Sequence, residues 1–317
     1  MNEFGLIARY FTRPAHNADL GVGDDCALMS VRTGMQLAVS VDMLVSGRHF
    51  FPDVDAESLG HKALAVNLSD LAAMGAEPRW FTLSLALPEL DEAWLAGFSH
   101  GLHTLADEHG ISLVGGDTTR GPLTISIQVA GELPQGSGLL RSAGLPGDDL
   151  WVSGTLGAAA AGVMHGTGRI VLPEAERLAA YARLERPTPR VALGMALRGI
   201  AHAALDLSDG LAGDLRHICT RSGCASELWL EAIPAAECLA VLPEPLRREA
   251  VLSGGDDYEL CFSAPSVARG QIQALSTALD VPLHRIGRLT EGEGVRVLLD
   301  GCDLNWQHGG FDHFGQA

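Results

Sequence analysis

The chain has almost no lysine. Of its 22 basic residues 21 are arginine, and Lys62 is the single lysine among 317 residues. Lys62 lies between His61 and Ala63, so the phosphate-binding pattern GxxxxGK[ST] is absent. A strand lysine of the VAIK type with an HRD loop, the mark of protein kinases, is absent as well. If the chain handles ATP, it does so without either familiar lysine.

Cysteine motifs and long apolar runs are also missing. The six cysteines, at positions 26, 219, 224, 238, 261 and 302, form no CxxC pair. Their spacing predicts neither a zinc site nor a disulfide framework, and it fits reduced thiols in the cytoplasm. No run of about 18 apolar residues indicates a transmembrane helix. The first residues, MNEFGLIARYF, lack the basic and apolar regions of a signal peptide.

Positive charge is scarce. The formal net charge is −17 at pH 7, which argues against nucleic acid as a partner because a polyanion needs a basic footprint. Small phosphorylated ligands remain compatible with this charge if metal ions mediate the contact. The length and the 47% hydrophobic content predict a well-packed protein of two domains.

The chain contains an alternation of apolar strands and amphipathic helices, which predicts an α/β or layered α+β fold. Strands are expected within 35–44, where the strand ends at Asp42, and at 79–88, 111–116, 122–133, 149–154, 203–206, 258–265, 282–289 and 295–299. Helices are expected at 56–75, 91–110, 155–166, 189–201 and 266–279, and a further helix is expected to follow the strand at 203–206 and to open at Asp209. The stretch 134–149 is rich in glycine and proline, which places the domain boundary there. The predicted domains are 1–136 and 147–317.

Acidic residues recur beside glycine, serine or apolar runs. Asp24 and Asp25 lie in GVGDDCAL, and neither has a basic residue nearby in the sequence. Further acids lie at the ends of predicted strands, within or at the start of predicted helices, or directly before a predicted strand: Asp42, Asp70, Asp117, Asp206, Asp209, Asp256 and Asp257. Each single Gly-Asp pair is also an ordinary turn. Their number, however, predicts a cluster of carboxylates around hard cations such as Mg²⁺, which usually bridges carboxylates to phosphate oxygens.

Six motifs in register resemble those of the thiamine-monophosphate kinases, a family of the aminoimidazole ribonucleotide synthetase superfamily. They are GVGDDCAL, SVDMLVSGRHF, KALAVNLSDLAAMGAEP, VGGDTTRGP, LDLSDGLAGDL and SGGDDYELCF. The resemblance runs in order along nearly the whole chain. It implies a two-domain fold, with an N-terminal ATP- and Mg-binding domain whose sheet pairs across a homodimer, and a C-terminal α/β domain.

The resemblance also implies an activity and a set of site residues. The family transfers the γ-phosphoryl group of ATP directly to thiamine monophosphate, forming thiamine diphosphate and ADP, with several Mg²⁺ ions assisting. Asp42 and Asp70 are expected to be the most critical residues, and no residue is expected to act as a general base. The implied metal ligands are Asp25, Ser40, Val41, Asp42, Asp70, Asp117, Asp206 and Asp209. The implied nucleotide contacts are Gly116, Asp117, Arg141 and Ser208, and the implied substrate contacts are His49, Asp256 and Phe311.

Three positions depart from the family pattern. Val41 stands where relatives often have Thr, so that only its backbone carbonyl could bind a metal. Asp256 stands where Glu is expected, which shortens its reach by one methylene. His109 stands near a position where many relatives have Tyr, and that nucleotide contact is not carried over. Arg141 and Arg120 are candidates for additional phosphate clamps, since guanidinium pairs with phosphate at two points.

The sequence leaves two other functions open. A related enzyme could use the same ATP site on another acceptor, as in aminoimidazole ribonucleotide or selenophosphate synthesis. Selenophosphate synthetases carry a reactive Cys or selenocysteine near the N-terminus, whereas no cysteine precedes Cys26 here. A non-enzymatic cation-binding module would bind metal without nucleotide.

Overall fold

The computed structural model describes residues 3–307. The chain forms two compact units, each with its own sheet. The first comprises Met1–Leu71 and Ala76–Gly136, and the second comprises Ala72–Gly75 and Ser137–Ala317. Within the described residues, none of the helices has the length and hydropathy needed to cross a membrane.

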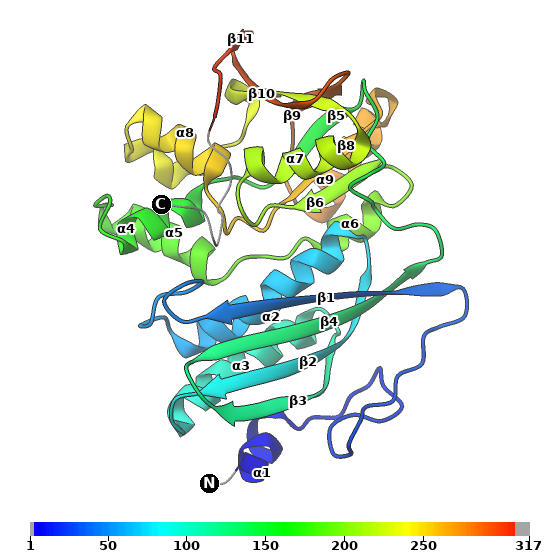
Figure 1. Ribbon diagram of the computed structural model, residues 1–317, viewed down its shortest axis with the longest axis vertical. Helices are drawn as coiled ribbons and strands as arrows, with labels where there is room; N and C mark the ends of the chain where they lie inside the picture. The colour runs from blue at the N-terminus through cyan, green and yellow to red at the C-terminus, as the bar shows by residue number, and fades with distance from the viewer. Residues whose placement is uncertain (1–2, 308–317) are drawn as a thin grey trace. The chain divides into compact units, whose positions relative to one another are not determined.

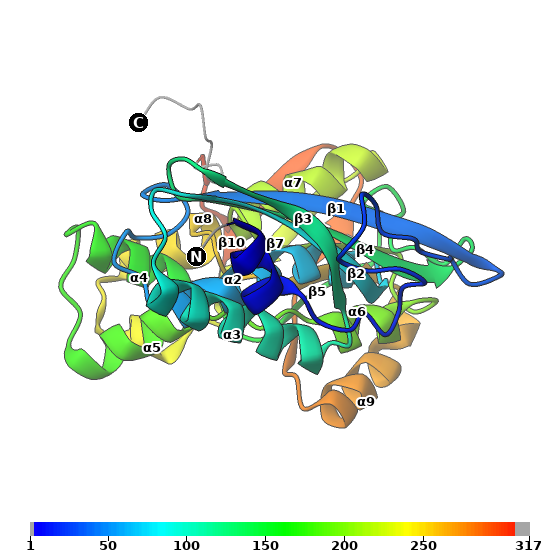
Figure 2. The same cartoon turned by 90° about the horizontal axis from the view of Figure 1, so that it is seen from below.

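The first unit is a four-stranded sheet with two long helices on one face (Figure 1). Its elements are α1 (Glu3–Leu6), a short π-helical turn η1 (Ile7–Phe11), β1 (Met35–Val45), α2 (Ala56–Ala73), β2 (Glu77–Leu87), α3 (Glu92–Glu108), β3 (Ser112–Arg120) and β4 (Thr124–Pro134). The strand order is β1-β4-β2-β3, antiparallel except for the β2–β3 pair. Figure 2 shows α2 and α3 together on the same side of this sheet.

Glycine lets α2 and α3 pack closely. A Cβ at Gly101 on α3 would lie 1.9 Å from the carbonyl oxygen of Glu57, and one at Gly60 on α2 would lie 2.0 Å from that of Phe98. Neither position has space for a side chain, so the backbones of the two helices touch. Fully buried Leu64 and Phe98 belong to the apolar core of this unit. This core fixes the face of α2 that meets β1.

The other face of β1 is apolar and open. Because side chains alternate along a strand, every second residue lies on this face. Four of these residues are about half exposed: Leu37 (47%), Val39 (53%), Val41 (58%) and Met43 (57%). We call them the β1 ladder. β1 is an edge strand, and an exposed apolar edge favours pairing with another chain.

The second unit is a seven-stranded sheet of order β11-β10-β7-β9-β5-β8-β6. Its strands are β5 (Asp149–Ser153), β6 (Ala203–Asp206), β7 (Ala225–Trp229), β8 (Leu260–Ala264), β9 (Leu283–Thr290), β10 (Gly294–Leu299) and β11 (Cys302–Asp303). Its helices are α4 (Ala158–Gly166), α5 (Glu174–Glu185), α6 (Val191–Leu197), α7 (Leu211–Ser222), α8 (Glu244–Ser253) and α9 (Arg269–Leu279), with 3₁₀ turns η2 (Leu230–Ala232), η3 (Glu237–Val241) and η4 (Ser266–Ala268). Side chains of α4, α7 and α8 join strand residues in one apolar core.

The layered α/β fold expected from the sequence is confirmed, and several element bounds differ. α5, α8 and β7 were not predicted. The strand expected at 111–116 continues to Arg120 as β3, and β1 continues to Val45. Asp117 and Asp42 therefore lie within strands, and the prediction that they follow strand ends is wrong. Asp206 does end its strand, β6, as predicted.

Candidate active site

A group of polar side chains lies between β1 and α2 in the first unit. Ser40 and Asp42 share the face of β1 that meets α2, because they are two residues apart. Ser40 Oγ donates a hydrogen bond to Asp70 Oδ2 at 2.5 Å, and the amide N–H of Asp42 donates to Asn67 Oδ1 at 3.0 Å. Asn67 and Asp70 are three residues apart on α2, so they face the same side. The Asp70 carboxylate and the Ser40 hydroxyl thus meet beside the Asn67 amide, and the Asp42 side chain lies on the same face of β1.

This donor set fits a hard cation. All of its side-chain ligand atoms are oxygen, which Mg²⁺ prefers over nitrogen or sulfur. In the part of the chain that the structure describes, no three Asp, Glu, His or Cys side chains come together as a metal site. Asp42 and Asp70, with Ser40, would therefore hold Mg²⁺ together with oxygens supplied from elsewhere, such as ligand phosphates or water. The larger predicted cluster of carboxylates stays a prediction.

Asp117 and Val41 lie on the opposite face of the sheet from Asp42. The strand register aligns Asp117 with Ser84, Ser84 with Ser126, and Ser126 with Met43 of the β1 ladder. Directly opposed residues share a face, so Asp117 lies on the ladder face at the other edge of the sheet. Its neighbour Gly116 has no side chain there, since a Cβ would lie 1.9 Å from the carbonyl oxygen of Leu83. The structure does not bring Asp117 next to Asp70 within one chain.

Asp25 and His49 occupy the two loops that flank β1. Asp24 and Asp25 are both exposed, so water can solvate the adjacent carboxylates. His49 is half-buried, and its Nδ1 accepts the amide N–H of Val45 at 3.0 Å. The neutral ring consequently carries its proton on Nε2, a tautomer assigned from this hydrogen bond. His49 is thereby oriented to donate from Nε2.

In the second unit, the loop between β6 and α7 carries three predicted site residues. Asp206 is the last residue of β6, and Ser208 and Asp209 follow in the turn before α7. The amide N–H groups of residues 208, 209 and 210 all donate to Oδ2 of buried Asp214, at 3.1, 3.0 and 3.1 Å. Burial raises the pKa of Asp214 to about 7, against the opposing effect of these hydrogen bonds.

A second loop of this unit binds to the first. The amide N–H of Asp256 donates to the carbonyl of Ser208 at 2.9 Å, and that of Tyr258 donates to the carbonyl of Leu207 at 2.8 Å. Asp256 has a φ of 67°, and a Cβ at Gly255 would lie 2.3 Å from the Ser208 oxygen. A candidate nucleotide residue and a candidate substrate residue thus share a backbone hydrogen bond.

The acids that follow Asp256 have structural partners. Asp257 is buried, and both of its carboxylate oxygens lie near the amide N–H of Gly157, at 2.9 and 3.1 Å, where α4 begins. Burial raises the pKa of Asp257 well above its usual range. Buried Glu259 accepts hydrogen bonds from Arg183, from Arg190 at two points and from Ser153. These contacts hold the strand that carries the second loop.

The two arginines predicted as phosphate clamps each take part in a hydrogen bond to a backbone carbonyl. Arg141 is exposed, and its carbonyl accepts a hydrogen bond from the Ser222 hydroxyl at 2.9 Å. Arg120, the last residue of β3, donates from Nε to the carbonyl of Pro88 at 3.2 Å. Phe311 lies outside the described residues.

Sequence reasoning missed three side chains of these sites: Asn67, Asp214 and Glu259. Asn67 lies inside the quoted motif NLSD, and its spacing of three residues from Asp70 on one helix was the available signal. Asp214 likewise lies in the motif LDLSDGLAGDL. Its contacts with three amides depend on the loop conformation, so spacing alone could not predict them.

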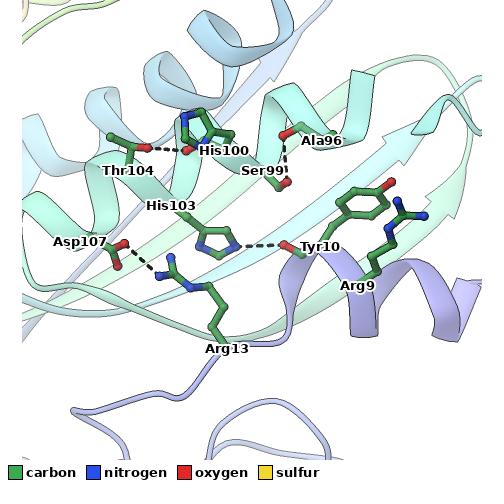
Figure 3. A pocket seen from close by; sticks show the side chains of 9 residues that line it. All are labelled: Arg9, Tyr10, Arg13, Ala96, Ser99, His100, His103, Thr104 and Asp107. Carbon is green, nitrogen blue, oxygen red and sulfur yellow. Dashed lines mark hydrogen bonds and ion pairs between the residues drawn. The ribbon is translucent and has the colours of Figure 1, made fainter. Parts of the chain in front are cut away.

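A separate pocket of about 450 Å³ lies between the N-terminal segment and α3 (Figure 3). Its arginines are paired, Arg9 with Glu92 at 2.8 Å and Arg13 with Asp107 at 2.9 Å. His103 donates from Nε2 to the carbonyl of Tyr10 at 3.0 Å, since a carbonyl can only accept. None of the predicted site residues lines this pocket.

Comparison with known families identifies the class of this two-unit fold. Residues 23–133 match the family described as "AIR synthase related protein, N-terminal domain". Residues 145–300 match "AIR synthase related protein, C-terminal domain". The chain therefore has both domains of an AIR synthase related protein.

Individual relatives narrow the class. The chain is 47% identical over 322 residues to the thiamine-monophosphate kinase of Escherichia coli O157:H7, covering 98% of each chain. The crystal structure of thiamine-monophosphate kinase from Stenotrophomonas maltophilia K279a has a TM-score of 0.85 at 46% identity, covering 93% of this chain and 94% of that one. A structure described as "AaThiL complexed with AMPPCP and TMP" has a TM-score of 0.79 at 31% identity, covering 90% and 89%. The chain belongs to the thiamine-monophosphate kinase family.

Proposed function

We propose that the protein transfers the γ-phosphoryl group of ATP to the phosphate of thiamine monophosphate, forming thiamine diphosphate and ADP. This reaction is the last step of thiamine diphosphate biosynthesis. The observation that carries the proposal is the oxygen-rich group of Ser40, Asp42, Asn67 and Asp70 in a chain whose full-length relatives are thiamine-monophosphate kinases. The relative that binds AMPPCP and TMP supports both ligands.

Charge is the main obstacle to this reaction, because both reactants are phosphorylated and repel each other. Phosphoryl transfer needs alignment and charge neutralisation more than covalent help from the protein. With 22 basic residues against 39 acidic ones, metal cations are proposed to supply much of the positive charge at the site. Bound Mg²⁺ would neutralise phosphate oxygens and bridge them to the protein.

The chain's own residues then hold and orient the reactants. We propose that Asp42 and Asp70, with Ser40, hold Mg²⁺. Further metal ligands are proposed to be Asp25, the Val41 carbonyl, Asp117, Asp206 and Asp209. Gly116, Asp117, Arg141 and Ser208 are proposed to contact the nucleotide, and His49, Asp256 and Phe311 to contact thiamine monophosphate. His49 would donate its Nε2 proton as a hydrogen bond to the substrate.

We further propose that the protein works as a homodimer in the cytoplasm. The β1 ladder supports self-pairing, since four half-exposed apolar side chains on an edge strand are best buried by a second copy. Six cysteines, all free and all within the described residues, fit a reducing compartment.

Product detection tests the function. The protein is incubated with ATP, Mg²⁺ and thiamine monophosphate, and thiamine diphosphate is detected by mass spectrometry. Unphosphorylated thiamine is the matched acceptor and should give no product, because it lacks the phosphate that the site is proposed to bind. Phosphorylation of neither acceptor, or comparable turnover of thiamine, would overturn the proposal. Nucleotide binding without turnover would point to another acceptor, and metal binding without nucleotide binding to a cation-binding module.

A further inference from the structure

The carboxylate of Asp214 accepts hydrogen bonds from three successive backbone amides of the loop that precedes α7. Its Oδ2 accepts the N–H groups of Ser208, Asp209 and Gly210 at 3.1, 3.0 and 3.1 Å. Asp214 is 5% exposed, so these bonds are shielded from water. Its own amide donates to the carbonyl of Gly210 at 2.9 Å, which closes the turn from the other direction.

This arrangement differs from an ordinary helix cap. In a capping box, the side chain at the third helical position reaches back to the amide of the N-cap residue alone. α7 begins at Leu211, so Asp214 is the fourth helical residue, and two of its donors precede the N-cap residue Gly210. The amides it binds belong to the loop, whereas a helix cap serves the first helical amides. Its contacts therefore define the loop conformation.

The backbone carbonyls of the same loop accept hydrogen bonds from the second loop. The carbonyl of Leu207 accepts from Tyr258, and that of Ser208 accepts from Asp256. Gly210 has a φ of 115°, and a Cβ there would lie 2.7 Å from the Ser253 backbone. Removing the Asp214 carboxylate would leave these carbonyl bonds and the core intact while three amides lose their acceptor. The effect should be local.

We propose that Asp214 is a positioning residue, which fixes the backbone of Ser208–Gly210 and thereby aims Ser208 and Asp209 at the metal–nucleotide complex. The inference rests on the proposed function for the identity of that ligand. This loop also differs from glycine-rich phosphate loops, in which the backbone amides at a helix start bind phosphate. Here those amides are occupied by a side chain of the protein, so the loop contributes through its side chains.

Three variants test the inference, with one matched control. Asp214→Ala removes the acceptor, Asp214→Asn keeps one oxygen that can accept the same amides, and Asp214→Glu keeps the carboxyl group but moves it by one methylene. The control is Asp91→Ala, because Asp91 Oδ1 also accepts two helix-start amides, those of Ala93 and Trp94 at 2.9 and 3.1 Å. Asp91 carries no proposed ligand contact.

Binding of Mn²⁺ with a non-hydrolysable ATP analogue is measured by electron paramagnetic resonance, alongside melting temperature and amide exchange at 208–210. Asp214→Ala and Asp214→Glu should each bind about tenfold more weakly, as losses of groups that orient metal ligands usually do. Asp214→Asn should bind within about threefold of wild type, because its remaining oxygen can still accept the three amides. If Asp214 instead acted through a negative charge, Asp214→Asn would bind as weakly as Asp214→Ala. Asp91→Ala should have a lower melting temperature and normal Mn²⁺ binding. Amide exchange at 208–210 should become faster in Asp214→Ala and stay unchanged in Asp91→Ala.

The outcomes are distinguishable. If wild type binds and both Asp214→Ala and Asp214→Glu bind equally well, the inference is overturned while the proposed function stands. If Asp214→Ala does not fold, Asp214→Glu decides in the same way. If wild type itself fails to bind Mn²⁺ with the analogue, the proposed function falls and the inference falls with it.

Discussion

The hydroxyl of Ser40 donates a 2.5 Å hydrogen bond to Oδ2 of Asp70, joining a strand to a helix thirty residues further along the chain. A hydrogen bond to a charged oxygen is stronger than one between neutral groups and fixes the direction of the carboxylate. Ser40 thus orients Asp70 within the proposed metal site.

Replacing the carboxylates of this group should remove activity without unfolding the protein. Asp42→Asn and Asp70→Asn should each lower kcat/KM by on the order of 10²- to 10³-fold, since a charge-stabilising group is lost from the site. Ser40→Ala should cost about tenfold, because it removes a neutral oxygen ligand and the hydrogen bond that orients Asp70, while both carboxylates remain. Steady-state kinetics with Mg²⁺ measures all three. Asp107→Asn, which breaks only the exposed pair with Arg13, is the control, and near-normal turnover in Asp70→Asn would remove that residue from the site.

Asp256→Asn separates a substrate contact from a turn residue. Asn tolerates the left-handed φ of 67°, so the backbone should keep its conformation while the charge is lost. If Asp256 binds the thiamine moiety, the KM for thiamine monophosphate should rise about tenfold, the loss of one charge-assisted hydrogen bond. The KM for ATP and the melting temperature should not change. Asp280→Asn, at a φ of 50° after α9, is the matched control, and identical kinetics in the two variants would leave Asp256 a turn residue.

Gly255→Ala should damage both stability and catalysis. The added Cβ would lie 2.3 Å from the Ser208 oxygen, so the hydrogen-bonded loops must separate. We expect a loss of about 1–3 kcal/mol in the free energy of unfolding together with lower kcat/KM. Gly270→Ala, in α9 with nothing within 4 Å of its Cβ, should instead stabilise by about 0.5–1 kcal/mol with full activity. Chemical denaturation and kinetics on both variants would reveal whether the loop contact matters.

The β1 ladder predicts the oligomeric state. Light scattering at micromolar concentration should give about twice the chain mass of 33.4 kDa. Val39→Asp places a charge in the ladder and should yield single chains, because burying an unpaired carboxylate is costly. Val267→Asp, at a residue 90% exposed in the second unit, should remain a dimer. A Val39→Asp protein that is still dimeric would show that the ladder is not the contact.

The first unit should lose stability in acid through Glu132. Burial raises the pKa of Glu132, but hydrogen bonds from the amide and guanidinium of Arg32 outweigh it and hold the pKa below its usual range. The folded state then binds fewer protons than the unfolded state, so this stabilisation is present above the ordinary Glu pKa of about 4.3 and is lost as pH falls through the lower folded value. Denaturation curves between about pH 6 and pH 3 should show a smaller fall for Glu132→Gln than for wild type. Equal slopes would exclude Glu132 as the source.

Sequence patterns predicted the alternation of strands and helices, and motif matching picked out both acids of the group at β1 and α2. The failure at Asp117 has a local cause. Two glycines before Asp117 indicated the end of a strand, but Gly116 lies inside β3. A glycine is needed there because the carbonyl of Leu83 on β2 leaves no room for a Cβ. The face on which Asp117 lies then depends on register, which the sequence of one strand does not specify. Asp214 was missed because its three donors converge only once the loop is folded.

Lys62, which the composition set apart, is 2% exposed within α2. Amine-selective reagents therefore find their only lysine target hidden in the native protein. The rate at which Lys62 is labelled therefore measures how often the first unit opens, because no other lysine reacts.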